Sequence, residues 1–185
     1  MVGKDAPRQV VWTSLEPPGI EYCSISERGS GWTLAGSLVR KAGKRVGVLS
    51  YTIETDSEWR TRGVIVEEVT AGKRFVLEMR PKGTRWLIGG KQAPALDGAT
   101  DVDLEASPVT NTLSIKRSGI RVGEKVDLIA AWVRSPSLKV EPLGQSYERL
   151  SKDRYRFSST SGFNCVIEVD EFGMVRKYGK YWRAV

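Results

Sequence analysis

The chain has 185 residues, of which 40% are hydrophobic, and its 29 Lys and Arg against 22 Asp and Glu give a formal net charge of +7 at pH 7. Histidine is absent, which excludes Ser-His-Asp and Cys-His catalysis as well as His-ligated zinc, copper or non-haem iron sites. No apolar run is long enough for a membrane-spanning helix. Because basic and acidic residues are interspersed along the chain, we interpret the net positive charge as a Lys- and Arg-rich surface rather than a phosphate-binding site.

The N-terminal stretch "MVGKDAPRQVVW" lacks the apolar segment of a secretory signal, so we expect a cytoplasmic protein. The two cysteines, Cys23 and Cys165, lie far apart and form no C-x-x-C motif. This spacing predicts neither a zinc site nor a disulfide framework. Cys165 stands in the apolar run "FNCVIEV", where we expect a buried structural thiol.

Alternation of apolar and polar residues, which is typical of half-buried β-strands, recurs along the chain. In residues 74–80, for example, Phe75, Leu77 and Met79 share one face. Several other strands carry apolar residues on both faces, and no convincing amphipathic helix is present. Turn signals, including one at Gly43, separate the strands at a spacing typical of an all-β sandwich, barrel or roll. The predicted strands are residues 31–39, 45–53, 61–69, 74–80, 126–133 and 163–170.

The chain carries a candidate internal duplication. Residues 75–83 and 165–173 align without gaps and share Val, Glu and Gly at matching positions, although two ordinary hairpin strands can match this well by coincidence. We therefore expect a single domain, residues 1–185, which is divided at most into two β-rich halves of about 1–95 and 96–185 that share one core. The segment Lys91 to Asp101 is the expected crossover between them.

Acidic residues crowd the stretch "DGATDVDLEASPVTNT". On a strand over 101–105, Asp101, Asp103 and Glu105 share a face. Backbones two residues apart on a strand are roughly 6.6 Å apart, near the separation in an inverting glycosidase, yet no sugar-subsite motif accompanies them. The pattern also lacks the Gly and the distal Glu of a calcium loop. We therefore favour a structural acidic corner, in which Asp101 and Asp103 pair with arginines, and we expect no metal; a His-independent hydrolase or isomerase using these two aspartates is the alternative.

The following segment, 109–117, alternates in the same way and is predicted to form a hairpin with 101–105, with Leu104 opposite Val109. Asn111 and Arg117 then fall on the apolar face. Buried polar groups need hydrogen-bond partners or a ligand, so both are candidate ligand-binding residues. The alternative is a satisfied core Asn and a snorkelling Arg.

Arg62 is likewise either a ligand-binding residue or a structural one. It shares a strand face with Val64 and Val66 close to Trp59. An arginine beside a tryptophan can bind a phosphate, a carboxylate or a flat ring. It can equally pair with a structural carboxylate such as Asp56 or Asp103.

The chain contains no RNP-type aromatic strand, Walker loop or G-x-G-x-x-G that opens a helix. We expect no nucleic-acid partner, and a basic nucleic-acid-binding module is the third alternative.

Four segments taken together resemble the bacterial family named putative glycolipid-binding proteins. They are "YTIETDSEWRTRGVIV", "LDGATDVDLEASPVTNTLSIKR", "AAWVRSPSLKVEPLGQSYER" and "VIEVDEFGMVRKY", and they extend from Tyr51 to Tyr178. Trp12, Glu21 and Gly36 fit the looser N-terminal pattern of the family. The sequence departs from the pattern at Ser114, where a Pro is expected, and near Ala99, where a Cys is expected.

The resemblance implies an all-β fold, a spiral β-roll of many antiparallel strands with an internal duplication and little helix, similar in architecture to bacterial carriers of lipoproteins and lipids. It implies a non-catalytic protein that binds a glycolipid or other amphiphile in a β-roll cavity, with no cofactor and with the oligomeric state left open. Apolar strand faces would hold acyl chains, and a few polar groups would orient the head. The candidate ligand-binding residues are Trp59, Arg62, Trp86, Asn111, Arg117, Trp132, Gln145 and Tyr147.

Overall fold

A computed structural model describes residues 6–42 and 44–185, so residues 1–5 of the N-terminal stretch and the predicted turn at Gly43 lie outside the described residues. The first half of the chain supplies β1 (Arg8–Leu15), β2 (Pro18–Arg28), β3 (Gly31–Ala42), β4 (Arg45–Thr55), β5 (Thr61–Thr70), β6 (Lys73–Lys82), β7 (Arg85–Ile88) and β8 (Lys91–Gln92). The second half supplies β9 (Asp101–Leu104), β10 (Lys125–Val133), β11 (Val140–Arg149), β12 (Arg154–Ser159), β13 (Asn164–Val169), β14 (Val175–Tyr178) and β15 (Trp182–Ala184). Two helices, η1 (Pro94–Leu96) and α1 (Thr110–Ser118), complete the fold.

All of these strands belong to one 15-stranded sheet, ordered β8-β7-β6-β5-β4-β3-β2-β1-β15-β14-β13-β12-β11-β10-β9. Neighbouring strands in the described part of the chain run antiparallel, except that β9 and β10 run parallel. The all-β prediction is confirmed, and each predicted strand of the first half corresponds to one of β3 to β6. The expected crossover contains β8 and η1.

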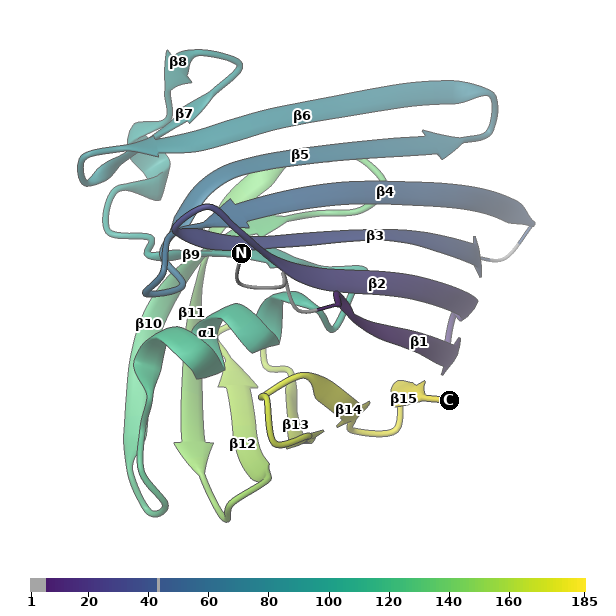
Figure 1. Ribbon diagram of the computed structural model, residues 1–185. Coiled ribbons are helices and arrows are strands. Elements are labelled where there is room, and N and C mark those ends of the chain that lie inside the picture. Colours follow the sequence, from purple (N-terminus) through teal and green to yellow (C-terminus); the bar gives the residue numbers. More distant parts are fainter. Residues whose placement is uncertain (1–5, 43) are drawn as a thin grey trace.

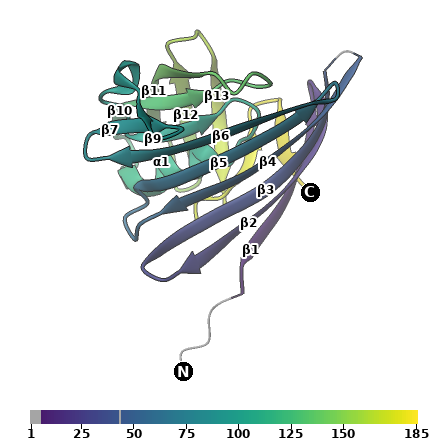
Figure 2. The same ribbon diagram turned by 90° about the horizontal axis from the view of Figure 1, so that it is seen from above.

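The sheet is rolled but open. β1 to β6 form a long curved layer that faces β10 to β12, and α1 lies between the two (Figure 1). Seen from above, the strands of the first half curve together around this interior (Figure 2). The two ends of the chain meet where β1 pairs with β15, with Trp12 opposite Ala184. The edge strands β8 and β9 are not neighbours in the strand order, so the roll does not close into a barrel.

The core fills the inside of the roll, because alternate residues of each long strand point inward. On β4, Leu49, Tyr51 and Ile53 are buried, and on β1 Trp12 is completely buried. The indole Nε1 of Trp12 donates a hydrogen bond of 2.7 Å to the carbonyl of Val175 on β14. This bond fixes the first strand of the chain against the last part of the sheet. Within the described residues, neither helix has the length and hydropathy needed to cross a bilayer.

The predicted strand over 109–117 is wrong, because these residues form helix α1. Residues 110–115 are all buried, and the side chains of Thr110, Asn111 and Ser114 are hydrogen-bonded, which offsets the weak helix propensity of Thr, Asn and Ser. Thr110, Ser114 and Arg117 recur at helical spacing and bond to the aspartates of β9. The helix ends at Gly119, which adopts the left-handed conformation that glycine tolerates best (φ 57°).

The predicted position of Arg62 on an apolar face is also wrong. The register of β4 and β5 shifts between Glu54 and Thr55, so that Glu54 pairs with Gly63 while Thr55 pairs with Thr61. Arg62 is the extra residue of this β-bulge. Its side chain is 65% exposed and forms an ion pair of 2.9 Å with Asp56.

The burial of Cys165 differs from expectation. Cys165, expected to be buried, is only half-buried, whereas Cys23 is fully buried on β2.

Candidate functional site

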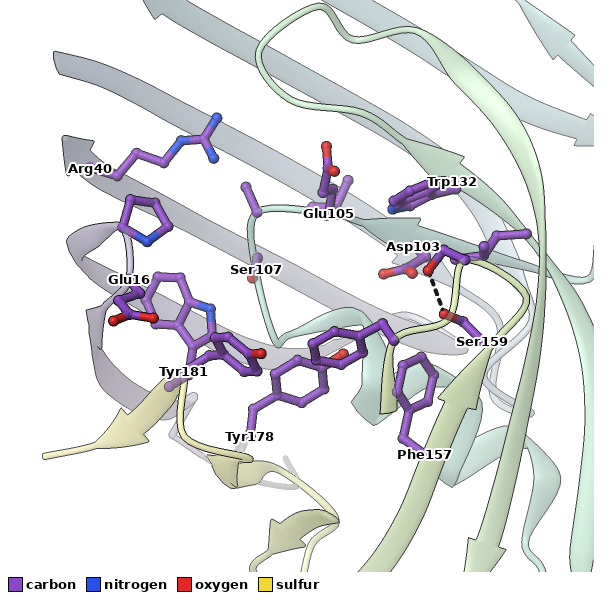
Figure 3. Close-up of a pocket in the computed structure, with 17 residues that line it drawn as sticks. Glu16, Arg40, Asp103, Glu105, Ser107, Trp132, Phe157, Ser159, Tyr178 and Tyr181 are labelled. Carbon is purple, nitrogen blue, oxygen red and sulfur yellow. Dashed lines mark hydrogen bonds between the residues drawn. The ribbon is translucent and has the colours of Figure 1, made fainter. Parts of the chain in front are cut away.

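A cavity of about 320 Å³ lies where the turn between β1 and β2, the segment after β9 and the C-terminal strands come together (Figure 3). We call it the aromatic pocket. Phe163 and Tyr178 stack with ring centroids 5.6 Å apart, and Tyr181 tilts against Phe163 at 5.3 Å. These contacts fix the orientation of the rings on one side of the pocket. The aromatic side chains of its wall are Trp132, Phe157, Phe163, Tyr178, Tyr181 and Trp182.

The charged groups of the pocket are mostly acidic. Within the part of the chain that the structure describes, its lining includes Glu16, Asp103 and Glu105 and one arginine, Arg40. The guanidinium of Arg40 is already engaged, because its Nη2 lies 3.2 Å from a carboxylate oxygen of Glu68, which is 1% exposed. Three serines add neutral polar groups, so the pocket offers hydrogen-bond acceptors rather than cationic donors.

Asp103 is the carboxylate that β9 holds at the pocket wall. Its two oxygens accept hydrogen bonds from the hydroxyl of Thr110 (2.9 Å) and from Nε2 of Gln145 (2.6 Å). Burial raises its pKa to about 6, although both of these hydrogen bonds act to lower the pKa. The Asp103 carboxyl is therefore hydrogen-bonded through both oxygens, and its pKa lies above the usual range.

A buried polar network stands behind Asp103. The hydroxyl of Tyr147 donates a 2.9 Å hydrogen bond to Oδ1 of Asn111 and lies 3.4 Å from Oε1 of Gln145. The amide of Asn111 donates in turn to the carbonyl of Pro108 at 3.1 Å. Asn111, Gln145 and Tyr147 are all buried. Because these groups bond to one another, they support the wall of the pocket and hold Asp103 in place.

A second buried network supports Ser107 on the same wall. The hydroxyls of Ser107 and Tyr51 each donate a 2.6 Å hydrogen bond to Oε1 of Glu21, and Ser107 accepts one from the backbone N–H of Val109. Burial raises the pKa of Glu21 to about 7. Its Oε2 has no hydrogen-bond partner among the described residues. The donor of Ser107 is thus committed to Glu21, and its oxygen keeps a lone pair free.

Gly36 makes this second network possible. A Cβ atom at position 36 would lie 2.3 Å from the hydroxyl oxygen of Tyr51 and 2.7 Å from the carbonyl oxygen of Tyr22. Only glycine leaves room for the Tyr51 ring to cross β3 and reach Glu21 on β2.

The sequence-predicted ligand residues do not form one site. Trp132 lines the aromatic pocket, and the guanidinium of Arg134 lies 4.0 Å from the centre of its ring. Asn111, Gln145 and Tyr147 lie behind the wall of that pocket. Trp59 is elsewhere, stacked on Trp32 with centroids 4.8 Å apart.

Arg62, Trp86 and Arg117 line a different cavity, of about 410 Å³, which we call the arginine groove. Trp86 is buried there and donates from Nε1 to the carbonyl of Ala99 at 2.9 Å. Arg60 and Arg85 line the groove as well, and none of the described Asp and Glu residues does so.

Asp101 and Asp103 face different partners, although they are two residues apart on β9. Asp101 is completely buried and accepts hydrogen bonds from Arg117 (2.6 and 2.8 Å) and from Ser114 (3.0 Å). Asp103 is bonded to no arginine among the described residues, contrary to the prediction. Asp101 does not line the aromatic pocket. The two carboxylates therefore do not open into one cavity, as the alternative hydrolase would require.

A metal site is equally unsupported. The described residues contain no group of three or more His, Cys, Asp or Glu side chains that could hold a metal ion.

The sequence reasoning missed most of the aromatic pocket. Phe157, Phe163, Tyr178, Tyr181 and Trp182 were not candidates, and neither were Glu16 and Arg40. One signal was available in the stretch "YGKYW", residues 178–182, where three aromatic residues fall within five positions. They meet Trp132 of β10 in the pocket although three strands, β13, β12 and β11, separate β14 from β10 in the sheet, and no local pattern shows this.

Comparison with known proteins assigns the chain to a family. The model of the family described as "Putative glycolipid-binding" matches residues 9–184. A crystal structure of a DUF1089 family protein from Pseudomonas aeruginosa is similar with a TM-score of 0.82 and 25% identity, over 90% of this chain and 92% of that one. A beta-barrel-like protein of the domain of unknown function DUF1849 from Brucella abortus shares the fold at 9% identity, with a TM-score of 0.57 over 96% of this chain and 94% of that chain. No curated protein matches the sequence.

Proposed function

We propose that this chain, which belongs to the family described as putative glycolipid-binding, binds an amphiphile by taking a neutral sugar-like head group into the aromatic pocket. One observation carries the proposal. Six aromatic side chains surround a set of hydrogen-bond acceptors in a single cavity. Ligand sites are typically apolar cavities with a few well-placed polar groups, and this cavity has that composition.

The polar lining favours a head group that donates hydrogen bonds. Asp103 and Ser107 present acceptor oxygens, and hydroxyl groups of a sugar are donors that match them. Glu105 adds negative charge to the wall, although its oxygens are engaged by the N–H of Ser135 and by Arg134. Flat aromatic faces provide apolar surface for the C–H groups of a sugar ring or for methylene groups. A phosphate or sulfate head would meet carboxylates instead, and the one arginine of the lining is already paired with Glu68. The charge of the pocket thus favours a neutral ligand over an anionic one.

The volume limits how much of the ligand enters. About 320 Å³ lies at the lower end of the range of about 300–1,000 Å³ for small-molecule sites. The pocket accommodates one head group or a short part of a chain, and most of the acyl portion of a lipid would remain outside. This differs from the expectation that apolar strand faces enclose the acyl chains, because the inner strand faces pack against α1 and each other instead.

Isothermal titration calorimetry with octyl glucoside below its micelle concentration tests the proposal. We expect saturable binding that Trp182→Ala weakens about tenfold, because the variant removes one aromatic wall. Trp32→Ala is the matched control, since Trp32 is also half-buried but packs against Trp59 and Phe172 outside the pocket. Octyl sulfate should bind much more weakly than octyl glucoside. Equal losses in the two tryptophan variants, or equal affinity for the two detergents, would refute the assignment.

A further inference from the structure

Four arginines from separate parts of the chain meet in the arginine groove. Arg60 and Arg62 lie at the start of β5, Arg85 begins β7, and Arg117 lies in the last turn of α1. The beginning of β5 and the hairpin of β6 and β7 lie at the same end of the sheet (Figure 1). None of the described acidic residues lines this groove, whereas three of them line the aromatic pocket. The two cavities therefore favour ligands of different charge.

Two of the guanidiniums are fixed by carboxylates that lie outside the groove lining. Nε and Nη2 of Arg117 donate to the completely buried Asp101 at 2.6 and 2.8 Å. Nη2 of Arg62 donates to Asp56 at 2.9 Å, and the same carboxylate accepts a hydrogen bond from the backbone N–H of Arg60. Nη1 of Arg117 and Nε and Nη1 of Arg62 form no hydrogen bond with the described residues. A guanidinium that is already oriented can use such N–H groups for a ligand at a small cost in entropy.

Arg85 adds positive charge that none of the described carboxylates offsets. Its Nη1 donates a 3.3 Å hydrogen bond to the amide oxygen of Gln92, and within the described part of the chain it forms no ion pair. Arg60 pairs with Glu58, but both side chains are more than half exposed. An exposed pair of this kind contributes little to stability, so a ligand can replace Glu58 at a small cost. The groove thus keeps positive charge for an anionic ligand.

The neutral residues of the groove favour a polar group over a flat ring. Trp86 is 2% exposed and its indole N–H is committed to Ala99, so it offers little surface for stacking. Thr61 also lines the groove and is 4% exposed, and its hydroxyl has no hydrogen-bond partner among the described residues. A buried hydroxyl without a partner is costly. An oxygen atom of a bound ligand would satisfy it.

We propose that the arginine groove binds the phosphate group of a phosphomonoester, which is either a small soluble compound or the head group of a lipid. Such a phosphate carries close to two negative charges at neutral pH and has three terminal oxygens. It can therefore accept hydrogen bonds from several guanidiniums at once. A carboxylate has one charge and two oxygens, so it matches fewer of the four arginines. The inference is independent of the ligand assigned to the aromatic pocket.

Isothermal titration calorimetry with two soluble phosphomonoesters tests the assignment. The probes are glycerol 3-phosphate and dibutanoyl phosphatidic acid, which carry the same phosphate and differ in their short acyl chains. We expect saturable binding of glycerol 3-phosphate and no binding of glycerol. Equal affinity for the two phosphates indicates a soluble ligand, whereas tighter binding of the phosphatidic acid indicates a lipid head group.

Two pairs of variants locate the binding site. Arg85→Gln should weaken phosphate binding about tenfold, because it removes charge-assisted hydrogen bonds from the groove. Arg80→Gln is its matched control, since Arg80 is exposed on β6 of the same hairpin and does not line the groove. Arg62→Gln should weaken binding by a similar factor. Its matched control is Arg74→Gln, because Arg62 and Arg74 are 65% and 66% exposed and each pairs with a carboxylate. Circular dichroism melting checks that every variant is folded.

Three results would overturn the phosphate assignment. One is a wild-type protein that binds neither phosphomonoester saturably. Another is a loss of affinity in the two control variants as large as that in Arg85→Gln and Arg62→Gln, because binding would then depend on net charge alone. The third is equal affinity for glycerol and glycerol 3-phosphate.

The two cavities are tested separately by the same variant. Arg85→Gln should lose affinity for glycerol 3-phosphate and keep its affinity for octyl glucoside, because Arg85 does not line the aromatic pocket. Octyl sulfate titrated into Arg85→Gln then reports mainly on the aromatic pocket. A parallel loss of affinity for octyl glucoside and glycerol 3-phosphate in this variant would contradict two separate sites.

Discussion

The inner and outer faces of the same strands differ in what covers their apolar side chains. Leu38 and Val39 are neighbours on β3, but Leu38 is completely buried inside the roll while Val39 is 45% exposed on the outside. The same contrast holds for Leu49 and Val48 on β4. The inner residues contribute to folding because they are removed from water, whereas the outer ones contribute little until something covers them. The comparison separates the residues that hold the roll together from those available for binding.

The largest expected effect comes from truncating an inner residue. Leu38→Ala should lower the free energy of unfolding by about 4 kcal/mol, because it removes a fully buried side chain and leaves a cavity. Val39→Thr on the outer face should change it by less than about 0.5 kcal/mol. Urea denaturation monitored by tryptophan fluorescence measures both values. A Val39→Thr variant as unstable as Leu38→Ala would mean that the outer face is packed against another part of the protein.

The next effect concerns a carboxylate on the inner face. Glu21 has an ordinary pKa of 4.5 and a folded-state pKa of about 7, which burial raises. Between these pH values the folded state keeps a proton that the unfolded state has released, so the group's contribution to stability is present below pH 4.5 and is lost as the pH rises to about 7. A shift of this size corresponds to about 3 kcal/mol.

The variant Glu21→Gln isolates this contribution. We expect the wild-type free energy of unfolding to fall more steeply between pH 4.5 and 7 than that of the variant, by about 3 kcal/mol over the whole interval. Asp103, whose pKa is also raised, keeps part of the pH dependence in the variant. Urea denaturation at several pH values provides the measurement. Glu67→Gln is the control from the outer face, where Glu67 pairs with Arg74. Parallel pH curves for wild type and Glu21→Gln would contradict the role of burial.

Much of the fold follows from local pattern. The period-two alternation predicted β3 to β6, β10 and β13, because each of these strands buries one face and the pattern records that burial. The apolar residues on both faces of several strands were also visible, and they include Val39, Val48 and Val69, which are exposed. The helix α1 was not predicted, because its buried face is largely polar: Thr110, Asn111 and Ser114 are buried and hydrogen-bonded through their side chains.

The candidate site was less predictable than the fold. Asn111 was identified as a polar residue that needs partners, and Gln145 and Tyr147 were candidate ligand-binding residues; in the structure Tyr147 bonds to both of the others. The aromatic pocket depends on contacts between β1, β9, β10 and β15, which come from widely separated parts of the sequence. No local period encodes those contacts. The proposed internal duplication remains a prediction.

The most direct test of the function is a crystal structure of the protein with octyl glucoside. We expect electron density for the sugar ring in the aromatic pocket against Tyr178 and Trp182, with a hydroxyl about 3 Å from a carboxylate oxygen of Asp103. A sugar ring bound in the arginine groove, or an aromatic pocket that remains free of detergent at concentrations that saturate binding in solution, would contradict it.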